Sequence, residues 1–230
     1  MKTFIVSLLV SWSILCYSQD LKSTYDTIEK GINSLPNILL QYRPKVIDNI
    51  FSEAKDFEKM GVEYMKQQDQ THAIESFKVA VFIYLHLENV EYGNKSCVMK
   101  CNGNLATDYV MMASCAMYDN PDEADVYVGK SSELLQTTTI DNSTCELVYH
   151  TLGEYYYLRA TLNKASNKSY SYETFKTIGY FEKAVSCTEI QYNYKKCGDY
   201  CDELSKYCED LGDYVNANKY KQKSIDFYSK

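Results

Sequence analysis

The sequence predicts an all-α protein, an array of about four helical hairpins held together by disulfide bonds. Two observations predict the helices: small and large apolar residues recur at helical spacing, and the alternation typical of strands is scarce. The chain has only three prolines and nine glycines in 230 residues. The disulfides are predicted by the cysteines, of which nine occur in the chain.

Residues 1–18 are predicted to be a secretory signal peptide. Lys2 gives a short positive start, and Phe4 to Leu15 is mostly apolar. Cys16 and Ser18 are small residues at the −3 and −1 positions of a cleavage site after Ser18. A buried N-terminal helix is the alternative. No later apolar segment is long enough to span a bilayer, so we expect a product of the secretory pathway, either in the lumen of the endoplasmic reticulum or secreted.

The rest of the chain divides into a helical cap or lead-in at 19–50, with Pro36 and Pro44, and a helical domain at 51–230. In 57–80, Phe57, Met60, Gly61 and Tyr64 are followed by Ala73, Phe77 and Ala80. This spacing resembles the tetratricopeptide repeat, a helical hairpin in which small residues mark close contacts between the helices. Gly61 and Ala73 would let the two helices approach each other, and Phe77 would fill the groove between them.

The same pattern recurs later in the chain. Residues 57–64 align with 149–156, which contains Gly153, and Phe181 and Ala184 then correspond to Phe77 and Ala80. Two weaker hairpins lie near 109–124 and 204–220. The pattern therefore predicts a domain in which one double-hairpin unit occurs twice.

Cysteines recur with the repeat as a Cys-x3-Cys pair and a later cysteine in each half. Eight remain after the signal peptide: Cys97, Cys101, Cys115, Cys145, Cys187, Cys197, Cys201 and Cys208. An even number in an exported chain favours disulfides. Zinc would favour Cys-x2-Cys or neighbouring histidines, so we expect no metal and no cofactor.

The sequence leaves the connectivity of the disulfides open. The pairings that we expect within each half are Cys101 with Cys115 and Cys201 with Cys208. Cys145 and Cys187, at the start and end of one hairpin, could also meet. Export of the chain is also indicated by three Asn-x-Ser/Thr motifs, the acceptors of N-linked glycans, at Asn94, Asn142 and Asn167.

Composition and motifs exclude several classes of function. The formal net charge is −7, and basic residues form no stripe, so neither nucleic acid nor a membrane is an expected partner. Patterns of serine hydrolases, zinc proteases and phosphate loops are missing. His86-Leu-Glu88 comes nearest to an iron motif, but it lies in an apolar helical run. We therefore expect no enzymatic activity.

The stretch GVEYMKQQDQTHAIESFKVAVFIYLHLENVEYGNKSCVMKC resembles the N-terminal helical domain of the leprecan group, and YFEKAVSCTEIQYNYKKCGDYC resembles its second copy. That group comprises the prolyl 3-hydroxylases and cartilage-associated protein. The resemblance covers roughly 47–228 and places Cys-x3-Cys further along the second helix of each hairpin. The chain departs from the pattern because Cys115 and Cys208 stand alone where the family tends to show a second Cys-x3-Cys, and because no dioxygenase domain follows.

The resemblance implies a non-catalytic scaffold that assists collagen prolyl 3-hydroxylation or chaperoning. Its partner would be a protein or extended peptide, such as collagen or a complex of prolyl hydroxylase and prolyl isomerase. By repeat position, Met65, Tyr118 and Tyr157 would line a groove for such a chain, although most of the 23 tyrosines could equally be core or surface residues. The alternative is a secreted ligand or effector that binds a cell-surface or extracellular protein.

Overall fold

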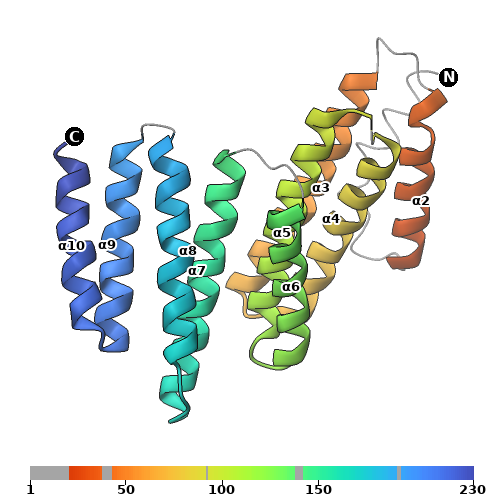
Figure 1. Cartoon of the computed structure of the whole chain (residues 1–230). Coiled ribbons are helices and arrows are strands. Elements are labelled where there is room, and N and C mark those ends of the chain that lie inside the picture. The colour runs from red at the N-terminus through yellow and green to blue at the C-terminus, as the bar shows by residue number, and fades with distance from the viewer. Residues whose placement is uncertain (1–20, 38–42, 92, 138–141, 191–192) are drawn as a thin grey trace.

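A computed structural model describes residues 21–37, 43–91, 93–137, 142–190 and 193–230, and this part of the chain is helical without strands (Figure 1). The all-α prediction is confirmed. The predicted signal peptide lies outside the described residues. The α-helices are α2 (Leu21–Asn33), α3 (Arg43–Lys66), α4 (Gln70–Val90), α5 (Lys95–Ala116), α6 (Pro121–Thr137), α7 (Asn142–Ala165), α8 (Ser171–Ile190), α9 (Tyr194–Leu211) and α10 (Tyr214–Tyr228).

The helices form a row in which most pack mainly against a neighbour in sequence, whereas α2 packs against α4 (Figure 1). The closest packing joins α3 to α4, α4 to α5, α5 to α6, α7 to α8 and α9 to α10. Helix α5 also contacts α7, and α8 contacts α9, which connects the hairpins. No described helix combines the length and the apolar character needed to cross a membrane.

Side-chain caps fix where four of the helices begin. In each case the residue before the helix accepts a hydrogen bond from the backbone N–H three residues later, which satisfies one of the unpaired donors of the first turn. These caps are Asp69, Asn94, Asn193 and Asp213. The cap at Asn94 corrects an expectation, because α4 ends at Val90 and the Cys-x3-Cys pair begins a new helix, α5. Asn193 likewise separates the second pair from α8.

In three of the helix pairs, an aromatic ring of one helix packs against a glycine of the other. A Cβ at Gly61 would lie 2.7 Å from Phe77 Cζ, and a Cβ at Gly153 would lie 2.5 Å from Phe181 Cδ2. Gly198 has the same relationship to Tyr228 between α9 and α10. The predicted Gly61–Phe77 contact and its repeat in the second half are therefore confirmed.

The buried core has two parts. The larger extends from α2 to α7, and the smaller joins α8, α9 and α10 around Phe181, Tyr200 and Tyr220. Helix α3 is continuous from Arg43 to Lys66, so the predicted boundary between 50 and 51 falls inside it.

Two of the predicted cysteine pairings are wrong, because both members lie on one helix. Cys101 and Cys115 are both on α5, about 21 Å apart along its axis, and Cys201 and Cys208 are both on α9, about 10 Å apart. A disulfide requires a Cα–Cα distance below about 7 Å. No disulfide bond joins the eight cysteines, all of which lie in described helices, so the disulfides stay a prediction.

Candidate binding site

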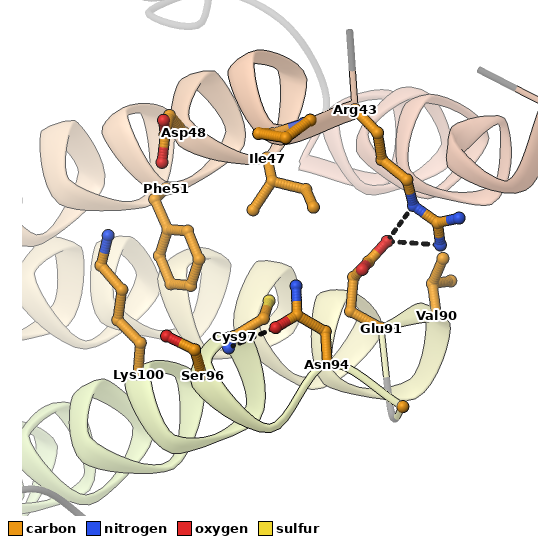
Figure 2. Close-up of a pocket in the computed structure, with 12 residues that line it drawn as sticks. Arg43, Ile47, Asp48, Phe51, Val90, Glu91, Asn94, Ser96, Cys97 and Lys100 are labelled. Atoms are coloured by element: carbon orange, nitrogen blue, oxygen red, sulfur yellow. Dashed lines mark hydrogen bonds and ion pairs between the residues drawn. The ribbon is translucent and has the colours of Figure 1, made fainter. Parts of the chain in front are cut away.

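A pocket of about 660 Å³ opens where the N-terminal ends of α3 and α5 meet the C-terminal end of α4 (Figure 2). Its apolar surface comes from Ile47 and Phe51 of α3 and from Val90 of α4. Polar and charged side chains surround this surface: Arg43, Asp48, Glu91, Asn94, Ser96 and Lys100. The site therefore combines an apolar floor with a charged rim.

An ion pair between Arg43 and Glu91 forms one end of the pocket (Figure 2). Arg43 Nε donates to Glu91 Oε1 at 2.7 Å, and Nη2 lies 2.6 Å from the same oxygen. Glu91 is 5% exposed, so the guanidinium compensates a carboxylate that water hardly reaches. The pair connects the first turn of α3 to the residue that follows α4.

Lys100 and Phe51 lie at the other end of the pocket (Figure 2). The Lys100 ammonium lies 4.1 Å from the centre of the Phe51 ring, within the range of a cation–π interaction. Asp48 lies beside Phe51 on α3. A ligand spanning the pocket would thus meet charged groups at both ends and apolar groups between them.

Cys97 lies in the wall of the pocket, in the first turn of α5. Its backbone N–H donates to Asn94 Oδ1 at 3.3 Å. A hydrogen bond from Cys101 lowers the pKa of the Cys97 thiol, and the charges of Lys100 and Arg43 act in the same direction against burial and Glu91. Cys101 is fully buried, and its pKa is raised by the same hydrogen bond and by burial.

The three residues predicted to share a groove, Met65, Tyr118 and Tyr157, lie in different surroundings. Met65 packs against the larger core from the last turn of α3. Tyr118 is 54% exposed and follows α5. Tyr157 stacks on Tyr207 of α9, with the ring centres 3.8 Å apart, and donates a hydrogen bond of 2.9 Å to Asp210. The structure therefore attaches Tyr157 to α9, and the groove stays a prediction.

Two of the predicted glycosylation acceptors are exposed. Asn94 caps α5 through Oδ1, which leaves the amide nitrogen, the atom that a glycan would join. Asn167 lies in the turn after α7 with φ of 55°. Asn142 is the first residue of α7, and its side chain lies outside the described part.

The pocket was not predictable from the sequence because its parts are distant in the chain. Arg43 and Glu91 are 48 positions apart. The only local signals were Pro44, which suits the first turn of a helix, and the Gly93-Asn94 pair, which is typical of a turn.

No family model matches the chain, and no curated protein matches it either.

Proposed function

We propose that this chain is a non-catalytic binding protein of the secretory pathway, built from tetratricopeptide-like hairpins, which holds an extended peptide in the pocket between α3, α4 and α5. The observation that carries the proposal is the pocket itself, with an apolar floor at Ile47 and Phe51 and charged donors at both ends. The repeated contacts of Gly61 with Phe77 and of Gly153 with Phe181 support the repeat assignment.

The chemistry of the rim favours a proline-rich segment. A polyproline helix leaves its carbonyl oxygens unpaired and offers few N–H donors. Arg43 and Lys100 are donors only, and they can meet such carbonyls while proline rings pack on the apolar floor. The leprecan resemblance points in the same direction, since the clients of that group are collagen chains.

Direct binding to a collagen-like peptide tests the proposal. We would measure the fluorescence anisotropy of a labelled single-chain peptide of Pro-Pro-Gly repeats, short enough not to form a triple helix, with the purified chain. Ser96 is exposed and lines the pocket, so Ser96→Trp fills the pocket without removing a core group. We expect this variant to weaken binding at least about tenfold, which is about 1.4 kcal/mol.

The matched control is Ser169→Trp, which adds the same ring at an exposed position in the turn before α8. It should bind like the unmodified chain, and circular dichroism should show both variants folded. Equal binding by the two variants, or no binding at all, would contradict the proposal.

A second measurement separates the scaffold from a secreted ligand. Affinity purification from secreting cells should recover the tagged chain from the lysate with collagen chains, a prolyl hydroxylase or a prolyl isomerase. Recovery only from the medium, with none of these partners, would remove the collagen assignment and favour a ligand for a surface or extracellular protein.

A further inference from the structure

A histidine and two glutamates meet between α7 and α9, away from the pocket. His150 and Glu154 lie four residues apart on α7, so they share one face of the helix. Glu203 reaches them from α9: His150 Nε2 lies 2.8 Å from Glu203 Oε2, and Nδ1 lies 3.5 Å from Glu154 Oε2. One donor atom from each residue can be chosen so that all three lie within 4.8 Å of one another.

Aromatic neighbours hold these side chains in place. The imidazole stacks on Tyr200, with centres 4.6 Å apart and planes 25° apart, and it meets the edge of Phe181 at 5.1 Å. The Tyr207 hydroxyl donates a hydrogen bond of 2.6 Å to Glu203 Oε1, the oxygen that does not face His150. The donors are therefore oriented before any ligand arrives, as the outer contacts of metal sites require.

The charges at this position favour a cation. Two carboxylates face a single imidazole, and the side chains of His150, Glu154 and Glu203 are 17%, 42% and 28% exposed. A third carboxylate nearby, Glu146, is 3% exposed and is compensated by Lys196 at 2.8 Å. Lys206 is the other cation that acts on Glu203. A divalent ion would offset the remaining negative charge.

We propose that His150, Glu154 and Glu203 form a binding site for a divalent transition-metal ion of the zinc class. Imidazole nitrogen with carboxylate oxygen is a donor set for zinc, whereas calcium prefers oxygen donors alone. Ligand atoms at about 2.0–2.2 Å from zinc are about 3.3–3.6 Å apart in tetrahedral geometry. Glu203 Oε2, now 2.8 Å from His150 Nε2, must therefore move slightly away from that nitrogen, and Glu154 Oε2, which lies beside Nδ1, must move toward an ion on the Nε2 side. Glu154, the most exposed of the three, is the side chain free to make that movement.

The site would connect two hairpins. His150 and Glu154 belong to the hairpin of α7 and α8, and Glu203 belongs to that of α9 and α10. Direct packing between α7 and α9 is slight compared with that inside each hairpin. A metal ion would therefore fix the position of the last hairpin. No metal was predicted from the sequence, because that prediction depended on the cysteine spacing and on histidines near cysteines.

Titration of the chelator-treated full chain with zinc chloride tests the site. Calorimetry should show one ion bound per chain with micromolar affinity, and zinc should raise the melting temperature. Glu203→Gln keeps the shape of the side chain and removes its charge, and we expect it to weaken this binding at least tenfold. His150→Ala should do the same.

The matched control is His72→Ala, which removes an exposed histidine facing one carboxylate, Asp69, at 2.7 Å. It should bind zinc like the unmodified chain. Because cysteine thiols also bind zinc, the deciding readout is the ring nitrogen signals of the three histidines by NMR. Zinc must shift the signals of His150 but not those of His72 or His86. Binding that leaves His150 unshifted, or that survives Glu203→Gln undiminished, would overturn the proposal.

Discussion

The ring of Phe181 packs directly against the backbone of Gly153, so that a Cβ at Gly153 would lie 2.5 Å from Phe181 Cδ2. Phe181 is fully buried. Phe77 has the same relationship to Gly61. Both helix pairs, α3 with α4 and α7 with α8, thus approach through a glycine.

Gly153→Ala should destabilise the protein. The added methyl group forces the α7 and α8 helices apart or strains Phe181, and overpacking of this kind costs about 1–3 kcal/mol. Urea unfolding measures the loss. Gly179→Ala on α8 is the matched control, because its added Cβ would meet no atom within 4 Å beyond the backbone of its own helix and its chain neighbours. It should stabilise the helix by about 0.5–1 kcal/mol, and a similar loss in both variants would contradict the packing argument.

Arg43→Ala should destabilise the protein through Glu91. The variant leaves a carboxylate that is 5% exposed without its cation, which costs about 1–3 kcal/mol. Adding Glu91→Gln should recover part of the loss in a double-mutant cycle. Lys66→Ala, which breaks an exposed pair with Glu63, should cause no measurable change in urea unfolding. Additive losses in the cycle would show that the pair does not couple.

Stability should fall as the pH rises, because of Asp108. This carboxyl is 1% exposed, and its Oδ2 has no hydrogen-bond partner among the described residues. Burial raises its pKa well above the usual value, as does the charge of Glu58, while Lys55 opposes both. The folded state therefore keeps a proton that the unfolded state releases above about pH 4. The free energy of unfolding decreases between that pH and the folded pKa, by up to about 1.4 kcal/mol per pH unit.

Asp108→Asn should remove this dependence and raise stability at neutral pH, as urea unfolding from pH 5 to 8 would show. Burial, with the charge of Asp56, also raises the pKa of Glu53 to about 7, which adds a slope of the same sign between about pH 4.5 and 7. The comparison is therefore best made in a Glu53→Gln background. Equal slopes with and without Asp108 would refute the assignment.

Oxidised protein should contain a Cys145–Cys187 disulfide. The two cysteines lie near facing ends of α7 and α8, and the charges of both contribute to raising the pKa of Tyr149, after burial. We expect a non-reducing peptide map to contain this pair and not Cys101–Cys115 or Cys201–Cys208. Cys187→Ser should then lower stability by about 2–4 kcal/mol under oxidising conditions only. A map in which Cys145 is joined elsewhere would disprove the pairing.

Contacts within one hairpin were predictable from the sequence. Gly61 and Phe77 are close in the chain, and the tetratricopeptide spacing relates them directly. The break at Gly93 and Asn94 was missed because the leprecan resemblance places the Cys-x3-Cys pair further along the second helix of the hairpin, and this put Cys97 on the wrong helix. That error led to the pairing of Cys101 with Cys115, which the cap at Asn94 places on one helix.

Contacts between hairpins were not predictable, because no local pattern encodes them. Tyr157 was assigned to a groove by its repeat position, and nothing in the sequence indicated the stacking between its ring and that of Tyr207 on α9. Tyr155 is fully buried on a helix, α7, that packs against both α5 and α8. His150 and Glu154 show helical spacing in the sequence, whereas Glu203 joins them only through the packing of α9.

The division of the core into two parts affects how easily each part of the chain unfolds locally. We expect the smaller part, which includes Tyr220 and Leu204, to become exposed while the larger part between α2 and α7 stays intact. Units of this kind open with different free energies. Backbone amides of α9 and α10 would then exchange with solvent before those of α4 and α5, and a protease would first cut the final hairpin, leaving a shortened but still folded chain.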